Sequence, residues 1–475
     1  MLAHRPLAPR GDCLRNNLSM TMSTVGAQFG PHRNTRGRAA VPQHRRLRDG
    51  EWWRSIPGWH DVDAATFHDH RWQLRNTVRS ADDLAQVLGE RAQPAFLADL
   101  RAALRRATMA VRVTPYTLSL INWADPAADP IRRQFLPLHS EQEPDHPMSR
   151  MDALAEQQDA VVPGLTHRYP DKVLLLCLDA CPTLCRCCTR SYSVGDDTEQ
   201  VDKCDLRIDP RRWDKAFRYL RGATQVEDVV VSGGDVGLLS AAHLRVIGEA
   251  LLDMPHIRRI RFATRAPAVL PQKLLSDRDW SETIGDLAAR GRQQGKQICV
   301  HTHFDHPDEI TEVTRQACDL LFQQGVPLRN QSVLLAGVND DLETMVTLIR
   351  RLAWINVEPY YVYLHDVVPG DDALRTSLAD AVELEKNVRG QTAGFMTPTF
   401  VCDALGGGGK RELHSYEHYD QQTGIGVYRS PVVDPDRPFF SFDPLRTLSA
   451  RMEMAWRSPA MRQSMVARAV AAAGM

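Results

Sequence analysis

Four of the ten cysteines in this 475-residue chain fall within eight residues. They stand in the stretch "CPTLCRCC", which begins at Cys181 and directly follows an apolar run. Cys181, Cys185 and Cys188 have the spacing C-x3-C-x2-C, and three thiolates on a short loop can hold three irons of a [4Fe–4S] cube. The fourth iron then lacks a protein ligand and can bind a substrate, as an open catalytic zinc position does. The spacing therefore favours an iron–sulfur site.

Two other interpretations of these cysteines are weaker. A closed structural zinc site usually takes four ligands in two pairs, and no second pair follows. Buried cysteines that act as small apolar side chains are implausible in a loop flanked by Arg186 and Arg190. Cys177 and Cys187 are spare, and we expect Cys177 to point away from the site along its strand.

A second candidate is the lysine that follows four glycines in the stretch "GGGGK", which ends at Lys410. This stretch is not a phosphate-binding Walker A loop, because Arg411 stands where that loop requires Ser or Thr. A lysine that forms a Schiff base needs an accommodating backbone and access to a carbonyl. Glycines also let the backbone approach a cofactor closely. A flexible loop with a solvated lysine is the alternative.

A regular alternation along the chain predicts the elements that position these residues. Near-continuous Val, Ile and Leu runs that alternate with helical stretches are typical of parallel strands covered by helices. Six such units suit a partial barrel or a doubly wound sheet, and in both folds the carboxyl ends of the strands face the active site. Polar residues at those ends therefore indicate function. The six apolar runs lie at 172–178, 226–235, 257–265, 297–304, 328–338 and 359–366.

Charge and hydropathy exclude two classes of partner. The formal net charge is -1 and no run of 18 apolar residues occurs, so we expect neither nucleic acid nor a membrane as a partner. Residues 1–50 hold nine arginines, no lysine and two acids, and we expect a disordered tail there. A transit peptide is one alternative for this tail. An upstream start codon, with Met20 or Met22 as the rival initiator, is the preferred explanation.

Four regions follow from these patterns. We expect the disordered Arg-rich tail at 1–50, and an N-terminal helical region with a connecting arm at 51–165. The strand–helix units predict a barrel at 166–400, and the lysine loop with a C-terminal extension occupies 401–475. We expect a cytoplasmic protein.

Besides the cysteines and the adjoining "CTR", the chain contains the stretches "GLTHRYPDKVLLL", "VSGGD", "THFDHP", "NQSVLLAGVND" and "DALGGGGK". Together these motifs resemble the lysine 2,3-aminomutase family of radical S-adenosylmethionine (SAM) enzymes. They occur in the family's order, from roughly residue 61 to residue 409. The resemblance implies an α/β fold, a partial (β/α)6 TIM-like radical SAM barrel with an N-terminal helical region and a C-terminal extension. It also implies a [4Fe–4S] cluster, SAM and pyridoxal 5′-phosphate (PLP) as cofactors.

The resemblance also assigns cofactor roles to individual residues. Gly233, Gly234 and Asp235 follow a strand, where exposed N–H groups and a carboxylate are available to the methionine part of SAM. Lys410 inherits the Schiff base with PLP. The remaining assignments are Cys181, Cys185 and Cys188 to the cluster, Arg168 and Lys172 to the PLP phosphate, Tyr363 to the PLP ring, and His303 and Gln331 to SAM.

The charged residues expected at the two ends of the bound substrate predict which substrate the protein takes. Arg190 matches the family residue that holds the α-carboxylate, a task suited to a guanidinium. Asp366 and Asp403 match the two aspartates that grip the ε-ammonium of lysine. Because two acids repel a carboxylate and select a cation, we expect lysine first and arginine second. The implied reaction converts L-lysine to β-lysine, after an electron from a flavodoxin- or ferredoxin-type donor has cleaved SAM.

Two departures from the family pattern stand out. Cys187 replaces the aromatic residue or histidine that usually precedes the third ligand, and a degenerate member without activity is one alternative. No cysteine follows Cys402, so we expect no structural zinc, and a homo-oligomer organised around such a site is in doubt. An electron-transfer or zinc-binding protein without catalysis is a further alternative.

Overall fold

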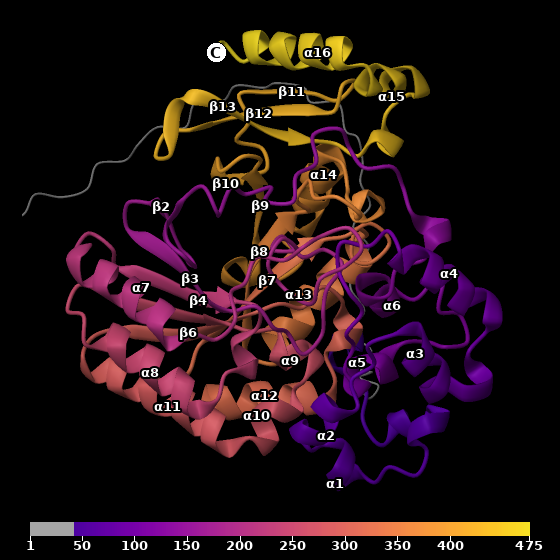
Figure 1. Cartoon of the computed structure of the whole chain (residues 1–475), viewed down its shortest axis with the longest axis vertical. Coiled ribbons are helices and arrows are strands. Elements are labelled where there is room, and N and C mark those ends of the chain that lie inside the picture. The colour runs from indigo at the N-terminus through magenta and orange to yellow at the C-terminus, as the bar shows by residue number, and fades with distance from the viewer. Residues whose placement is uncertain (1–41) are drawn as a thin grey trace, which may run out of the picture. The chain divides into compact units, whose positions relative to one another are not determined.

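A ten-stranded sheet, with its strands in the order β1 to β10, forms the centre of the part that the computed structural model describes, residues 42–475 (Figure 1). Strands β3 to β9 run parallel to one another, whereas β1, β2 and β10 are antiparallel to their neighbours. The bounds are β1 Ala160–Val162, β2 Leu165–Tyr169, β3 Lys172–Leu178, β4 Asp228–Gly233, β5 Arg259–Ala263, β6 Gln297–Thr302, β7 Leu328–Leu334, β8 Val357–Leu364, β9 Thr399–Ala404 and β10 Gly409–Glu412.

Helices connect the parallel strands and cover the outer face of the sheet (Figure 1). They are α7 Pro210–Gly222, α8 Ala241–Leu252, α9 Ala266–Val269, α10 Gln272–Ser276, α11 Arg278–Gln293, α12 Glu312–Gln323, α13 Leu342–Trp354 and α14 Leu378–Val388. A polar side chain accepts a hydrogen bond from the first turn of each long helix, which satisfies a backbone donor that the helix leaves free. These capping residues are Asp209, Ser240, Asp277, Thr311, Asp341 and Ser377.

The alternation of strands and helices confirms the predicted α/β fold. Strand β3 has the bounds expected from its apolar run, and each of the five other runs contains a parallel strand or overlaps one. The structure adds β9 to the parallel set, and this strand crosses the boundary that we expected at residue 400. Its six residues lack a long apolar run, which is why the sequence did not reveal it.

Short helices of the N-terminal region pack against the barrel. They are α1 Ala64–Phe67, α2 His70–Arg75, α3 Ala81–Leu88, α4 Pro94–Leu104, α5 Pro115–Leu120 and α6 Pro130–Phe135. The buried Tyr116 hydroxyl of α5 lies 2.8 Å from the hydroxyls of Thr311 and Thr314, at the start of α12. Within residues 42–475, no helix is long and apolar enough to cross a membrane.

The prediction of a disordered tail needs a correction at its C-terminal end. Arg48 donates hydrogen bonds to the carbonyls of Ser119 and Leu120, at 3.3 and 3.2 Å. The Arg45 guanidinium lies 4.6 Å from the ring centre of Trp354. Residues 42–50 are therefore held against the folded protein by their arginines, whereas the rest of the expected tail lies outside the described residues.

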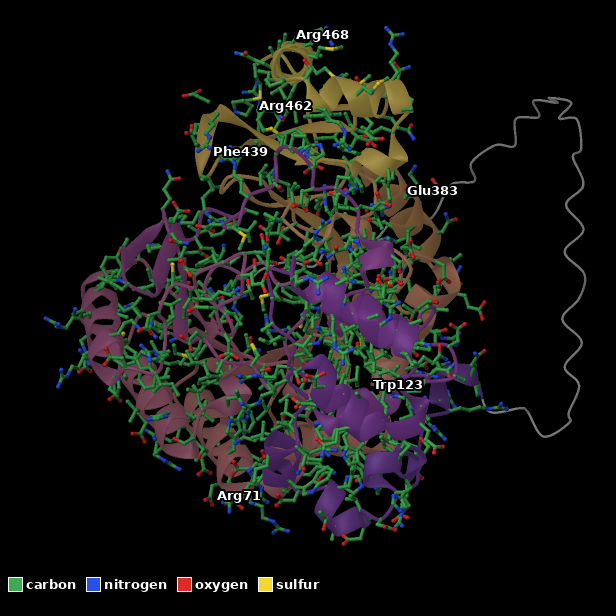
Figure 2. All side chains as sticks on the ribbon, turned by 45° about the vertical axis from the view of Figure 1, so that its right-hand side comes forward. Arg71, Trp123, Glu383, Phe439, Arg462 and Arg468 are labelled. Atoms are coloured by element: carbon green, nitrogen blue, oxygen red, sulfur yellow. The ribbon has the colours of Figure 1, made fainter. Side chains whose placement is uncertain are left out.

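The C-terminal extension forms a second, antiparallel sheet with two helices over it (Figure 2). Its elements are β11 His418–Asp420, β12 Ile425–Ser430, β13 Asp434–Phe442, α15 Ala450–Arg457 and α16 Pro459–Ala472. Met465 and Ala469 of α16 are buried, whereas Arg468 is on the outer surface of the helix. The sequence predicted a C-terminal extension here, but it did not reveal the sheet beneath these two helices.

Trp456 anchors this extension, and its replacement should destabilise the protein. The ring is fully buried against Phe442 and His146, and its Nε1 donates to the carbonyl of Thr423 at 2.8 Å. We expect Trp456→Ala to lower the free energy of unfolding by about 3–5 kcal/mol, because it leaves a large cavity. Met454→Ala, at a side chain that is 67% exposed, should change it by less than about 0.5 kcal/mol in the same urea titration. Equal effects of the two variants would contradict this assignment.

Candidate active site

The sheet curves around one cavity of about 560 Å³, whose lining residues come from every strand from β2 to β10. This arrangement is the inside of an open barrel. The cavity brings together all of the residues that the sequence singled out, although they lie up to 242 positions apart along the chain. These residues are Cys181, Cys185, Cys188, Arg168, Lys172, Arg190, Gly233, Gly234, Asp235, His303, Gln331, Tyr363, Asp366, Asp403 and Lys410.

The three cysteines form the thiol end of the cavity. Their side chains are half-buried, and burial raises the pKa of each thiol, that of Cys188 to about 12. Arg265, at the carboxyl end of β5, donates from Nη1 to the Cys185 sulfur at 2.8 Å. Its Nη2 donates to Glu309 at 2.7 Å and to Gln134 at 2.6 Å. This buried cation favours a negatively charged sulfur ligand beside it.

The arrangement of the three thiols suits an iron–sulfur cluster. Among residues 42–475, no three His, Cys, Asp or Glu side chains converge closely enough to hold a single metal ion. A [4Fe–4S] cube does not require such convergence, because each thiolate binds a different iron. Cys187 lies 7% exposed in an apolar cluster with Leu335, Val338 and Leu374. Its thiol therefore contributes to packing, as well as to the cavity wall.

Two buried polar atoms of β6 point to a ligand in the middle of the cavity. His301 Nε2 and Thr302 Oγ1 have no hydrogen-bond partner within the described part of the chain, and both residues line the cavity. Burial lowers the pKa of His301 to about 3, so its ring is neutral. An unpaired polar group in the interior is costly, and a bound molecule with its own donors and acceptors would remove that cost.

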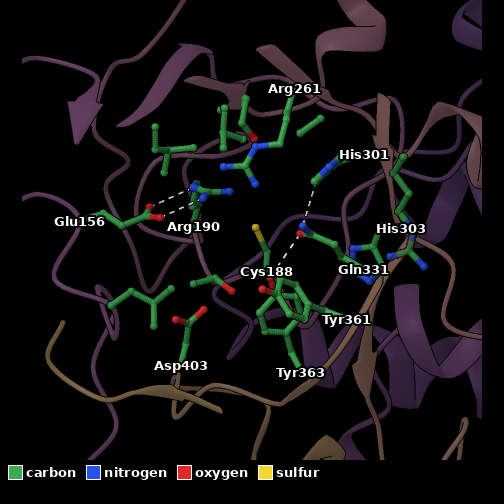
Figure 3. A pocket seen from close by; sticks show the side chains of 18 of the residues that line it. Glu156, Cys188, Arg190, Arg261, His301, His303, Gln331, Tyr361, Tyr363 and Asp403 are labelled. Atoms are coloured by element: carbon green, nitrogen blue, oxygen red, sulfur yellow. Dashed lines mark hydrogen bonds and ion pairs between the residues drawn. The ribbon is translucent and has the colours of Figure 1, made fainter. Parts of the chain in front are cut away.

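A chain of hydrogen bonds joins this region to the lysine end (Figure 3). Gln331 Nε2 donates to His301 Nδ1 at 3.0 Å, and the Tyr363 hydroxyl donates to Gln331 Oε1 at 3.4 Å. His303 is held in a different direction, with its Nε2 2.7 Å from Asp305 Oδ2. The Gln331 amide therefore already makes two hydrogen bonds, and its remaining N–H and oxygen lone pair are available to a ligand in the cavity. His303 uses only Nε2 in its bond to Asp305, so its Nδ1 is also available.

The "SGGD" stretch differs from what we expected. The backbone N–H groups of Gly234 and Asp235 donate to the carbonyls of Leu178 and Ala180, at 2.6 and 2.8 Å. A side chain at Gly234 would place its Cβ only 2.2 Å from the Ala180 oxygen, so the glycine allows a close backbone contact. These N–H groups are thus unavailable to a ligand.

Asp235 is likewise committed to the fold. Its carboxylate is 3% exposed and accepts from the backbone N–H groups of Gly237 and Arg265, at 2.7 and 2.8 Å, and from the Thr264 hydroxyl. It therefore joins the end of β4 to the end of β5. Three of the roughly four lone-pair positions of this carboxylate are thus occupied by the fold, which leaves about one, on Oδ2, for the amino group of SAM.

The β9–β10 hairpin places Lys410 in the cavity. Lys410 pairs directly with Asp403 across the hairpin, and Lys410 Nζ lies 2.9 Å from Asp403 Oδ2. The turn holds Gly406, Gly407 and Gly409 at φ of +80°, +92° and +74°, values that only glycine adopts freely. Glycine is needed for a second reason, since a Cβ on Gly409 would lie 2.2 Å from the Tyr169 hydroxyl.

Lys410 carries its proton in this state. Burial lowers its pKa, but the carboxylate of Asp403 outweighs burial and raises it well above the usual value. Lys410 Nζ also lies 5.1 Å from the ring centre of Tyr363. A Schiff base requires the neutral amine, so Lys410 can react only when this ion pair opens.

Asp366 is the second carboxylate at the lysine end. It accepts a hydrogen bond from the Thr189 hydroxyl at 2.7 Å. Burial, followed by repulsion from Asp403, raises its pKa to about 7. Two carboxylates that disfavour each other in this way create a strong preference for a cation between them.

The sequence missed Glu156, which lies in the segment before β1 (Figure 3). Arg190 donates from Nε and Nη2 to its two carboxylate oxygens, at 2.9 and 2.8 Å. Burial would raise the pKa of Glu156, but Arg190 outweighs burial and lowers it. One edge of the Arg190 guanidinium is therefore occupied, and the Nη1 side alone remains for a carboxylate.

The two basic residues expected at the phosphate, Arg168 in β2 and Lys172 at the start of β3, also have partners. Arg168 donates from Nε to Asp159 at 2.6 Å and from Nη2 to the Leu154 carbonyl. Lys172 Nζ is 4.1 Å from the ring centre of Tyr169. Both still line the cavity, as does Tyr169, whose hydroxyl accepts from the backbone N–H of Lys410 at 3.0 Å. A phosphate here would meet two cations and a phenol.

Sequence comparison identifies the family to which this chain belongs. The chain is 40% identical to the L-lysine 2,3-aminomutase of Clostridium subterminale over 351 residues, 74% of this chain and 79% of that protein. The protein of the same name from Acetoanaerobium sticklandii is 38% identical, with the same two shares. The chain belongs to the lysine 2,3-aminomutase family. Membership confirms the resemblance seen in the motifs and, at the level of the family, the prediction of an isomerase with a [4Fe–4S] cluster, SAM and PLP.

Two further similarities, one to a curated sequence and one to a solved structure, are more distant. The glutamate 2,3-aminomutase of Clostridioides difficile is 30% identical over 348 residues, 73% of this chain and 76% of that protein. A radical SAM methyltransferase of known structure from Sphaerobacter thermophilus shares 16% identity over 50% of this chain and 68% of that chain. Its TM-score of 0.30 is too low to carry an argument. No protein-family model matches the chain.

The raised pKa of Asp366 predicts a pH-dependent stability. An aspartate with a folded-state pKa of about 7 stabilises the fold below the pKa of the unfolded chain, and this contribution is lost as the pH rises through about 7. We expect Asp366→Asn to be more stable than the native protein at pH 8, and to show no such gain near pH 4, in urea titrations. Asp202→Asn, at an exposed position, is the control and should follow the native curve. Parallel curves for Asp366→Asn and the native protein would contradict the burial of this charge.

Proposed function

We propose that the protein converts L-lysine to β-lysine by moving the amino group from C2 to C3. The observation that carries this proposal is the pair of carboxylates, Asp366 and Asp403, beside Lys410 in the cavity that also contains the three thiols. The members of this family that are named for lysine are also the most similar of the relatives described above.

The residues of the cavity fit the three cofactors. When bound, the cluster and SAM supply the radical that removes a hydrogen atom, and PLP holds the migrating amino group. Cys181, Cys185 and Cys188 would hold the cluster. His301 Nε2 and Thr302 Oγ1 offer unpaired polar atoms for SAM, together with Gln331 and His303. We assign the PLP phosphate to Arg168, Lys172 and Tyr169, the PLP ring to Tyr363, and the PLP aldehyde to Lys410.

The charges of the cavity select the substrate. In the absence of substrate, the Lys410 ammonium lies against Asp403. Were Lys410 to hold PLP, its ammonium would no longer neutralise Asp366 and Asp403, and the ε-ammonium of lysine would take its place between the two acids. The substrate carboxylate would bind the free Nη1 side of Arg190. Glutamate would place a carboxylate against two others, which disfavours it.

Arginine remains the second candidate, because a guanidinium can pair with the same two acids.

The proposed function also implies partners. A one-electron donor of the flavodoxin or ferredoxin type would reduce the cluster. A homo-oligomer is a further proposal. We place the reaction in the cytoplasm, where thiols stay reduced.

Cluster binding should distinguish Cys188 from Cys187. Cys188 lines the thiol end as the third residue of the ligand spacing, whereas Cys187 packs in an apolar cluster. After anaerobic reconstitution, we expect Cys187→Ser to retain about four irons per chain, and Cys188→Ser to lose most of them. Iron and sulfide analysis measures this. Equal iron contents in the two variants would contradict the assignment of the ligands.

Product analysis tests the proposed reaction. The reconstituted protein, reduced under anaerobic conditions and supplied with SAM and PLP, would be incubated separately with labelled lysine, arginine and glutamate. We expect β-lysine from lysine, no product from glutamate, and no product from any substrate with Lys410→Ala. Turnover of arginine alone would overturn the choice of lysine. A protein that binds iron and PLP but converts none of the three would overturn the aminomutase itself.

A further inference from the structure

One short turn, residues 152–159, contacts three of the candidate functional elements. Glu156 binds Arg190, as described above. The Leu154 carbonyl and Asp159 both accept from Arg168. The Ala153 carbonyl accepts from the N–H of Gly406, in the glycine turn that precedes Lys410, at 2.8 Å. This turn thus links the guanidinium for the substrate carboxylate, the basic residue for the phosphate, and the lysine hairpin.

The backbone of the turn is held in an unusual conformation that directs Glu156 into the cavity. Asp152 accepts from the N–H groups of Glu156 and Gln157, both at 2.9 Å. Ala155 has a φ of +54°, in the left-handed region that non-glycine residues rarely adopt. Backbone strain of this kind persists only where the surroundings determine it, and it gathers at functional sites.

Glu156 is anchored more firmly than Arg190. The Glu156 side chain is 5% exposed, whereas that of Arg190 is 25% exposed. The Tyr192 hydroxyl donates to Glu156 Oε2 at 3.0 Å, in addition to the two bonds from Arg190. The carboxylate therefore acts as a fixed point, and the guanidinium of the longer side chain takes its orientation from it.

We propose that Glu156 is a positioning residue, which fixes Arg190 so that the Nη1 side of its guanidinium meets the α-carboxylate of the substrate. This inference rests on the proposed function and names a residue that acts through Arg190. Without Glu156, a flexible guanidinium in a cavity with Asp366 and Asp403 has other carboxylates to pair with. Bonding through Nε and Nη2 prevents that pairing and leaves one side of the guanidinium free.

Binding measurements with two ligands test this role. Lysine and 1,5-diaminopentane share the distal ammonium, and only lysine has a carboxylate. Each would be titrated into PLP-loaded protein, with the change in PLP absorbance as the readout. We expect Glu156→Gln to weaken lysine binding on the order of ten-fold, because a charged two-bond pair becomes a neutral contact. Binding of 1,5-diaminopentane should stay within about two-fold of the native value.

A matched control separates positioning from general destabilisation. Arg132 and Glu141 form a similar pair, with bonds of 2.9 and 2.6 Å, and neither residue lines the cavity. Glu141→Gln should leave the ratio of the two affinities unchanged. If Glu156→Gln does not fold, Tyr192→Phe removes one bond to Glu156 and should shift the ratio in the same direction by a smaller factor.

The outcomes distinguish the two proposals. Unchanged or tighter lysine binding by Glu156→Gln, or an equal loss for both ligands, would overturn the positioning role while the proposed function stands. Tighter binding would mean that Glu156 acts mainly by repelling the substrate carboxylate. A native protein that binds no PLP, or that does not bind lysine more tightly than the diamine, would overturn the proposed function and the positioning role with it.

Discussion

The ion pair between Lys410 and Asp403 depends on the register of one hairpin, and the chemistry of the cavity depends on that pair. Strand β9 adds a parallel strand to the barrel, and β10 turns back along it, so that Lys410 lies directly opposite Asp403. A slip of one residue would turn the lysine to the other face of the sheet. The glycine turn prevents the slip, because its positive φ values and its contact with Tyr169 admit no larger residue. The four glycines of the sequence thus specify a defined turn.

Charge pairing organises the rest of the cavity. Each cation that could bind part of a substrate or cofactor already has an acidic or carbonyl partner, Arg190 with Glu156 and Arg168 with Asp159 and Leu154. Such pairing lowers the cost of burying charge and keeps each side chain in one orientation before a ligand arrives. The lysine end differs, because two carboxylates, Asp366 and Asp403, share the single cation Lys410. This excess of negative charge favours the binding of a second cation at that end.

Much of this site could be predicted from the sequence, because parallel strands bring their carboxyl ends to one side of a sheet. The apolar runs located the barrel strands, and polar residues within or just after these runs, such as Gln331 and Asp366, line the cavity. The sequence could not reveal which backbone and side-chain groups would form hydrogen bonds with one another. Asp235 was expected to face a ligand, and it lines the cavity, but most of its hydrogen-bonding capacity is used to join β4 to β5. Glu156 lies in a connecting segment without periodicity, so only the folded chain brings it to Arg190.

We infer that the thiol end and the lysine end of one cavity act on the same substrate molecule. Lysine carrying deuterium at C3, incubated with the reduced, reconstituted protein and SAM, would reveal whether they do. Deuterium should appear in the 5′-deoxyadenosyl group in the native protein, and Lys410→Ala should abolish this transfer although its iron content is normal. Transfer that persists in Lys410→Ala, or that is absent from the active native protein, would mean that the two ends do not share a substrate.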